Sequence, residues 1–441
     1  MRNNRLFPIS LYDKETRKRR LNIKLCKSHD RATRRLTASG DVLVLGQGDV
    51  GQLGLGPDVL ETWRAEVVHG SNAMDICAGA MHTLYLTASG EVFSFGCNDE
   101  GVLGRPTDTF DGSEASPGRV HLPEPVLRIS SGDSHAAALT QSGDVYIWGN
   151  FRDSAGCLGL TPAGCPVPLP HKLLDRVVQI SSGADHLVML NEDGAVYTVG
   201  CAEQGQLGRV PSCFSVRGGR RGLGYILTPQ KIRLHVRRRG LGYILTPQKI
   251  RLHVRGCKSR AFDAIWTGSY CTFMRLKETQ MVYGCGLNNF NQLGVIEGSD
   301  EGVEFSPRLL TSFLTQRWEK ISGGQHHTLL MDDEGGVYSV GRKEYGRLGH
   351  GEDGTDLDKP MRLDNLPVCS DISTGDVVSF AVSADGKAYA WGMGTNGQLG
   401  QGTDEDIYTP TVMTGRALAT RKALLASGGG QHAVLLASPL Q

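Results

Sequence analysis

Residues 46–54 read Gly-Gln-Gly-Asp-Val-Gly-Gln-Leu-Gly, and this stretch sets a pattern that recurs along the chain. In each copy a glycine is followed eight positions later by a second glycine, which a leucine precedes. The copies are Gly46–Gly54, Gly96–Gly104, Gly200–Gly208, Gly286–Gly294, Gly341–Gly349 and Gly392–Gly400, with a longer one at Gly149–Gly159. Successive copies begin 50, 53, 51, 86, 55 and 51 residues apart, so the sequence predicts seven units of one kind.

A second motif, Gly-x-x-His or a variant with a small apolar residue, alternates with the first. Its fourth positions are His82, His135, His186, Cys271, His327, Val378 and His432. A short apolar run follows, then a turn such as Glu192-Asp193-Gly194, then a second apolar run that ends at the first motif. Because Asp-Gly turns tolerate a positive φ, this order predicts one β-hairpin in every unit. The 58 glycines among 441 residues, against a usual share of about 7%, also favour many tight turns.

A single small sheet cannot bury both of its faces, whereas seven sheets arranged radially bury them against one another. The predicted fold class is therefore all-β, a seven-bladed β-propeller. The first unit begins at Thr37 without a Gly-x-x-His half, and the last ends with such a half at 429–438. We expect these two halves to pair and close the ring, which removes free sheet edges. The expected domains are a basic, disordered N-terminal arm at 1–36 and the propeller at 37–441.

Charge is distributed unevenly along a chain whose net charge is only +1. The arm carries twelve Lys or Arg against three acids, which is typical of a nuclear address or a nucleic-acid contact. A merely solvated tail is the alternative. The eleven cysteines lack metal-ligand spacing, and those in apolar runs are expected to be reduced core residues of a nuclear or cytosolic protein: Cys77, Cys97, Cys201 and Cys285. Without an apolar run of about 18 residues or a secretory segment, we expect no membrane association and no export.

The sequence offers little for covalent chemistry. It shows no nucleophile–base constellation, no phosphate loop with Lys-Ser/Thr and no metal spacing, so we expect neither an enzyme nor a cofactor. The Gly-x-x-His histidines recur at equivalent places in separate blades, and we expect them mainly in the core. A binding module is the class of function that remains.

Loops at one end of the blades carry the polar residues suited to binding. The turn residues there, with the loops of the first motif, form a largely acidic ring that suits a basic partner surface. Equally, each aspartate can cap its own turn, and the residues alone do not decide between these readings. The long copy, residues 149–156, reads Gly-Asn-Phe-Arg-Asp-Ser-Ala-Gly. Its extra residues are expected to project as a hairpin wedge with Phe151 and Arg152 entering a partner, unless it is a plain tolerated insertion.

The repeat resembles that of the regulator of chromosome condensation family over about 400 residues and all seven units. Further matching strings lie at 46–56, 94–101, 132–135, 204–211, 322–328 and 391–396. WD-type repeats are shorter and carry a Trp-Asp dipeptide, which this chain lacks. The resemblance implies a nuclear, chromatin-bound guanine nucleotide exchange factor for the small GTPase Ran, without covalent chemistry.

The resemblance also assigns residues to that activity. GTPase binding and exchange are expected of Asp49, Asp133, Asp185, Arg209, His326 and His432. The wedge is expected to comprise Asn150, Phe151, Arg152, Asp153, Ser154 and Ala155, although its tip residues are smaller than the family suggests.

For chromatin, the resemblance implies contacts with the histone acidic patch and with DNA of the nucleosome. The histone candidates are Arg217, Arg220 and Arg221, since an arginine fork suits clustered carboxylates. The DNA candidates are Lys258, Arg260, Arg17, Lys18, Arg19 and Arg20, and the arm is also expected to bind importin.

The sequence departs from the family pattern in the region of the histone candidates and the DNA loop. Residues 220–237 are repeated identically at 238–255, a tandem copy too short to form a blade. We expect one copy to fill the blade position and the other to loop out. The main functional alternative is an interaction or ubiquitin-ligase adaptor propeller without exchange activity, against which the wedge and the acidic ring argue.

Overall fold

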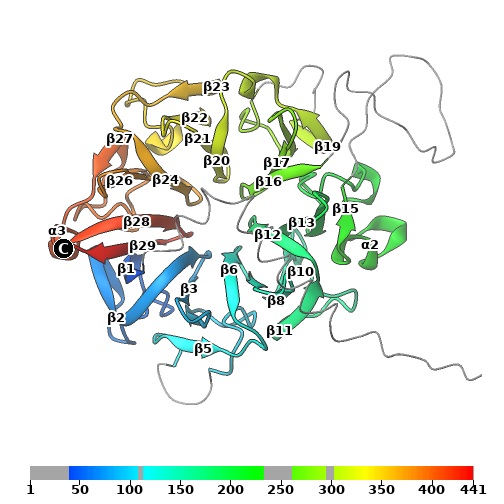
Figure 1. Cartoon of the computed structure of the whole chain (residues 1–441), viewed down its shortest axis with the longest axis horizontal. Helices are drawn as coiled ribbons and strands as arrows, with labels where there is room; N and C mark the ends of the chain where they lie inside the picture. Colours follow the sequence, from blue (N-terminus) through cyan, green and yellow to red (C-terminus); the bar gives the residue numbers. More distant parts are fainter. Residues whose placement is uncertain (1–38, 108–112, 233–260, 295–301, 441) are drawn as a thin grey trace, which may run out of the picture. The chain divides into compact units, whose positions relative to one another are not determined.

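The computed structural model describes residues 39–107, 113–232, 261–294 and 302–440. The chain divides into two units, Met1–Ala38 and Ser39–Gln441, and every described residue belongs to the second. Within that unit, antiparallel sheets follow one another around a common centre, as Figure 1 shows. The expected basic arm lies outside the described residues.

Seven blades of four strands make up this unit, and they are numbered here in chain order from blade 1 to blade 7. The strands of blades 1 to 3 are β2 (Glu61–Ala78, second half), β3 (His82–Thr87), β4 (Val92–Gly96), β5 (Gly118–Val120); β6 (Val126–Ser131), β7 (His135–Thr140), β8 (Val145–Gly149), β11 (Val167–Leu174); and β12 (Val177–Ser182), β13 (His186–Asn191), β14 (Val196–Gly200), β15 (Gln230–Lys231). Those of blades 4 to 6 are β16 (Phe262–Thr267), β17 (Cys271–Leu276), β18 (Val282–Leu287), β19 (Val303–Leu309); β20 (Trp318–Gly323), β21 (His327–Asp332), β22 (Val337–Gly341), β23 (Leu357–Arg362); and β24 (Cys369–Thr374), β25 (Val378–Ser383), β26 (Ala388–Gly392), β27 (Ile407–Val412).

Blade 7 joins the two ends of the propeller and confirms the predicted closure. It consists of β28 (Arg421–Gly428), β29 (His432–Pro439), β1 (Gly40–Gln47) and the first half of β2. Strand β1 pairs with β29 from Asp41↔Ala437 to Gly46↔His432. Because β2 pairs first with β1 and then with β3, blades 7 and 1 share one continuous strand. The predicted seven-bladed β-propeller is thus confirmed.

Short helices and one extra hairpin complete the described residues. The helices are η2 (Ser212–Phe214), η3 (Gly219–Arg221), α2 (Gly224–Leu227), η4 (Thr311–Phe313), η5 (Glu344–Gly346) and α3 (Arg416–Ala419). The hairpin pairs β9 (Arg152–Asp153) with β10 (Gly156–Cys157). No helix within the described parts of the chain is long and apolar enough to cross a membrane.

The first glycine of each long motif lies at the end of the third strand of its blade or one residue before that end, and the chain turns there with a positive φ. Gly200 has φ +122°, and a Cβ at this position would lie 2.4 Å from the carbonyl oxygen of Asp185. No other residue type fits so close to a neighbouring backbone. The glycine thereby fixes where the polar loop of each blade begins.

Four of the five Gly-x-x-His histidines, His82, His186, His327 and His432, contact a hydroxyl of the next blade, and the predicted core position of all five is confirmed. His432 is 0% exposed, and its Nε2 lies 2.8 Å from Thr83 Oγ1, which donates to the carbonyl of Gln52 at 2.9 Å. Equivalent chains of contacts are His186–Thr272–Gln206 and His327–Ser379–Arg347. Each hydrogen bond of this kind contributes about 1 kcal/mol, so these histidines add to the apolar contacts between neighbouring blades.

The duplicated segment contributes its first copy to the propeller. Gln230 and Lys231 form β15 against Thr198 and Tyr197 of β14. Ile226, Leu227 and Ile232 of the same copy are buried in the core. The second copy, 238–255, lies outside the described residues. The cysteine prediction holds for Cys201 and Cys285, which are free and buried, whereas Cys77 and Cys97 are only partly buried.

Candidate functional site

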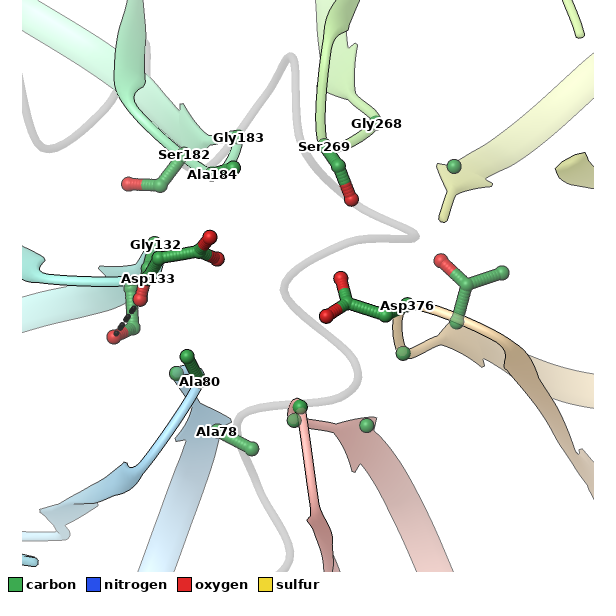
Figure 2. Close-up of a pocket in the computed structure, with 18 residues that line it drawn as sticks. Ala78, Ala80, Gly132, Asp133, Ser182, Gly183, Ala184, Gly268, Ser269 and Asp376 are labelled. Atoms are coloured by element: carbon green, nitrogen blue, oxygen red, sulfur yellow. Dashed lines mark hydrogen bonds between the residues drawn. The ribbon is translucent and has the colours of Figure 1, made fainter. Parts of the chain in front are cut away.

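The seven Gly-x-x-His turns meet at one end of the propeller and line a cavity of about 90 Å³ at its centre. We call this end of the blades the turn face. Backbone bonds tie neighbouring turns together: the N–H of Asp133 donates to Ala184 at 2.8 Å, and that of Ala184 donates to Ser269 at 2.9 Å. Figure 2 shows the carboxylates of Asp133 and Asp376 pointing toward the centre from opposite sides. The turn face therefore carries its acidic groups on a rigid ring.

The carboxylates of this ring are held in an environment that disfavours their charge. Burial raises the pKa of Asp133 well above its usual range, and the nearby Asp376 and Asp185 raise it further. Burial raises the pKa of Asp376 too, although hydrogen bonds from Gln325 and Ser269 oppose the shift. Such an arrangement favours a cationic partner, because a positive group would restore the charged form of the carboxylates.

Asp185 links the ring to the loop 149–159. Burial raises its pKa to about 6, against the opposing influence of the Arg152 N–H, which donates to Asp185 Oδ1 at 2.7 Å. Asp49, at the rim, is exposed and accepts a hydrogen bond from Gln52 Nε2 at 3.0 Å. The aspartates therefore differ: Asp49 binds within its own loop, whereas Asp185 holds the backbone of another blade.

The loop 149–159 forms the predicted hairpin, but its apolar residue does not project. Phe151 is 0% exposed and packs against His135 with ring centroids 4.6 Å apart. Asn150 is also buried; its Nδ2 donates to Glu100 at 2.8 Å and its Oδ1 accepts the Gly159 N–H at 2.8 Å. The prediction that Phe151 enters a partner is wrong in this structure, because the aromatic ring anchors the hairpin from below.

The exposed part of the hairpin is polar and is braced by its neighbours. Arg152, Ser154 and Ala155 are exposed, and Arg152 Nη1 lies 2.5 Å from Glu100 Oε1. The backbone N–H and hydroxyl of Ser154 both donate to the Glu203 carboxylate, at 3.1 and 2.8 Å. Glu203 was not predicted, although its place in the polar loop after Gly200 was a usable signal. The exposed end of the hairpin is therefore held by Glu100, Asp185 and Glu203 of neighbouring loops.

Arg217, expected at histones, instead binds the wedge. Its Nε and Nη2 lie 2.8 and 3.0 Å from the two oxygens of Asp153, and Nη2 also donates to the Cys157 carbonyl at 3.1 Å. The Asp153 side chain is 2% exposed and that of Arg217 is 41% exposed. In this structure the ion pair joins the segment after β14 to the hairpin, so Arg217 is a support of the wedge.

Arg209 also makes internal contacts. Its guanidinium donates to the carbonyls of Thr198, Tyr225, Ile226 and Thr228 at 2.8–3.3 Å. Burial lowers its pKa to about 10. The guanidinium of Arg209 binds backbone carbonyls of its own chain, including those of the segment that leads to β15. The role of Arg209 in binding a partner therefore stays a prediction.

The two remaining histidine candidates differ in exposure. His326 is half-buried on the turn face, 5.0 Å from the Phe290 ring centroid. His432 is fully buried, and burial lowers its pKa to about 4. The assignment of His432 to GTPase binding or exchange stays a prediction; its buried side chain contacts Thr83 of the neighbouring blade. Asp376 was missed because Val378 replaces histidine in its motif, although the glycine of that motif marked the turn.

The chromatin candidates are only partly described. Arg220 and Arg221 are exposed, and the Arg221 guanidinium stacks 4.8 Å from the Phe214 ring and 4.6 Å from the Tyr225 ring. Lys258, Arg260, Arg17, Lys18, Arg19 and Arg20 lie outside the described residues. Within the described ranges, no group of three or more His, Cys, Asp or Glu could hold a metal ion.

The chain is similar in sequence to a known family and to named relatives. The model of the RCC1-like domain matches residues 41–435. The Mus musculus protein named Regulator of chromosome condensation is 49% identical over 406 residues, 91% of this chain and 91% of that protein. The Saccharomyces cerevisiae protein named Guanine nucleotide exchange factor SRM1 is 28% identical over 331 residues, 70% of this chain and 61% of that protein.

Two solved structures of yeast Prp20 are also similar, each with a TM-score of 0.79 and 27% identity over 92% of this chain. One, covered to 93%, is "The Crystal Structure of Prp20p from Saccharomyces cerevisiae and Its Binding Properties to Gsp1p and Histones". The other, covered to 90%, is "Crystal structure of Kap60 bound to yeast RCC1 (Prp20)".

Proposed function

This chain belongs to the RCC1-like domain family of regulators of chromosome condensation, and we propose that it is a guanine nucleotide exchange factor for the small GTPase Ran. The observation that carries the proposal is the braced hairpin beside a rigid ring of buried carboxylates. A yeast relative is named an exchange factor, and the yeast Prp20p structure describes binding to Gsp1p. Both descriptions fit a propeller that grips a GTPase on one face.

The proposed mechanism is thermodynamic linkage. The turn face binds nucleotide-free Ran more tightly than nucleotide-loaded Ran, and by reciprocity it weakens nucleotide binding by the same factor. Each 1.4 kcal/mol of differential binding lowers nucleotide affinity about tenfold. No covalent bond forms and no cofactor takes part.

Individual residues have distinct parts in this proposal. The carboxylates of Asp49, Asp133 and Asp185 meet cationic groups of the GTPase, and His326 lies at the rim of the same surface. Arg152, Ser154 and Ala155 form the tip that presses on the nucleotide-binding region. Asn150, Phe151 and Asp153 hold that tip in place, as do Glu203 and Arg217. His432 and Arg209 act indirectly, by fixing the ring and the segment before β15.

Chromatin binding is the second part of the proposal. Arg220 and Arg221 are offered to the histone acidic patch, with Arg217 as a secondary candidate because Asp153 engages it. Lys258, Arg260 and the basic arm contact DNA, and the arm also binds importin. Yeast Prp20 is described with histones and with Kap60, which supports a nuclear, chromatin-associated protein with these partners. Nucleosome binding should weaken in Arg220→Glu and with rising salt.

The exchange activity is tested by loading Ran with a fluorescent guanine nucleotide and measuring release on addition of the full-length chain and excess unlabelled nucleotide. We expect fast release that falls at least tenfold in Asp185→Ala. Asp358→Ala, an exposed carboxylate on β23, is the matched control and should release nucleotide at the unaltered rate. Release no faster than from Ran alone, by a folded protein, would favour the adaptor function.

A further inference from the structure

Three of the polar loops share a device that fixes the path of their backbone. The glutamine of the Gln-Leu-Gly segment that ends each of these loops accepts a hydrogen bond from the backbone N–H of the residue two positions earlier. The pairs are Val50–Gln52 at 3.0 Å, Gln204–Gln206 at 2.9 Å and Phe290–Gln292 at 3.0 Å. The loop of blade 5 has Arg347 in place of this glutamine, and a guanidinium has donors but no acceptor.

The backbone of the blade 5 loop is correspondingly turned over. Arg347 Nε donates to the carbonyl of Glu344 at 2.7 Å. That carbonyl belongs to the Glu344–Tyr345 peptide, the unit whose N–H faces the glutamine in the other three loops. Tyr345 consequently has φ +60° and ψ +17°, whereas none of its counterparts in those loops has a positive φ. Exchanging an acceptor for a donor has therefore reversed one peptide unit.

This reversed peptide costs stability in two ways. A tyrosine in the left-handed region is strained because its Cβ crowds the backbone. In addition, Arg347 is 1% exposed, Nη1 is buried without a hydrogen-bond partner, and Nη2 reaches Glu344 Oε2 only at 3.6 Å. Strain that a rigid surrounding structure maintains is often tied to function.

The reversal changes what the turn face presents. Tyr345 is 40% exposed, one of ten large apolar side chains that are exposed in the described part of the chain. Its loop begins beside the turn of blade 5, since the Arg342 N–H donates to the His326 carbonyl at 2.9 Å. Arg342 bonds Glu344 at 2.7 Å and stacks 4.5 Å from the Phe290 ring centroid. The tyrosine thus stands on a braced platform at the rim of the proposed binding face.

We propose that Tyr345 is an anchor residue with which the turn face binds the GTPase, and that Arg347 is the positioning residue that holds it outward. Exposed tyrosines on rigid backbones are favoured anchors, because the ring adds contact area at little cost in conformational entropy. The inference rests on the proposed exchange function and adds to it a contact on blade 5, away from the wedge on blade 2.

Exchange on fluorescent-nucleotide-loaded Ran tests the inference through KM and kcat of full-length variants. Tyr345→Ala should raise KM roughly tenfold while the melting temperature is unchanged. Arg347→Gln restores the acceptor, should turn the peptide back and should raise KM similarly. Arg347→Lys keeps a donor and should stay near the unaltered value. The double variant Tyr345→Ala/Arg347→Gln should be no worse than Tyr345→Ala alone, because both changes remove one contact.

Met361→Ala is the matched control, since Met361 is 43% exposed on β23 of the same blade, and its KM should not move. An unchanged KM in Tyr345→Ala, with active unaltered protein, would overturn the inference and leave the exchange function standing. Equal losses in Arg347→Gln and Arg347→Lys would overturn the positioning role. Inactive unaltered protein would instead reject the exchange function, and the inference with it.

Discussion

The loops 149–159 and 341–349 follow equivalent strands, β8 and β22, but depart from the common loop in different ways. The first gains two residues and becomes a hairpin that neighbouring blades brace through Glu100, Glu203 and Arg217. The second keeps its length and exchanges glutamine for arginine, which reverses one peptide. An insertion thus needs support from other blades, whereas a substitution can reshape a loop from within its own blade.

Removing the anchor of the wedge should have the largest effect. Phe151→Ala deletes a fully buried ring, and we expect a loss of about 3–5 kcal/mol in the free energy of unfolding. Urea denaturation measures it. Nucleotide release should slow as well, because the hairpin loses the base on which it stands. A loss below about 1 kcal/mol would show that the wedge does not depend on this ring.

The pH dependence of stability tests how Asp185, which is largely buried, differs from the exposed end of the hairpin that it supports. The pKa of Asp185 rises from 3.8 in the unfolded chain to about 6 in the folded protein, so the carboxyl group takes up a proton on folding at pH values between these two. The protonated carboxyl group therefore contributes stability at low pH, and this contribution is lost as the pH rises through about 6. Asp185→Asn should therefore be more stable than the unaltered protein at pH 7, by about 1–3 kcal/mol. The difference should shrink toward pH 4. Urea denaturation at both pH values checks this, and an advantage that grows toward pH 4 would contradict the assignment.

Breaking the bidentate contact between Arg217 and Asp153 should have a smaller effect on stability. The Arg217 side chain is 41% exposed, so solvent screening keeps the change in stability in Arg217→Ala below that expected for Asp185→Asn or Phe151→Ala. We expect kcat for exchange to fall more than KM rises, since the wedge loosens while the acidic ring is unchanged. Arg220→Ala, at an exposed position three residues on, is the control and should alter neither value of exchange.

The smallest effect is expected at the strained tyrosine. Tyr345→Gly removes the strain of a positive φ, but the added freedom of the unfolded chain offsets much of the gain. The net change should be about 0.5 kcal/mol in favour of the variant. Thermal unfolding at fixed protein concentration measures it. A clear loss of stability would mean that packing of the tyrosine ring stabilises the fold by more than the positive φ of Tyr345 destabilises it.

The sequence by itself determined the elements that depend on spacing. Repeated glycines and Asp-Gly turns specify hairpins locally, and the split unit at the two ends required closure by β1 and β29. The two extra residues after Gly149 were enough to predict a hairpin. The core position of the Gly-x-x-His histidines could also be predicted. Equivalent positions in separate blades lie far apart, so a motif that recurs in each blade is expected to serve packing within the blades.

Only the tertiary structure decided which side chains meet across blades. Phe151 is buried against the ring of His135, which lies on strand β7. Arg217 binds Asp153 although 64 residues separate them in the sequence. Asp133 and Asp376 face one another because ring closure brings distant turns to one centre. The reversed peptide at Tyr345 likewise follows from an arginine buried beneath it. Local sequence sets the turns, but such contacts depend on residues far apart in the chain, whose distances are fixed only when the seven blades close.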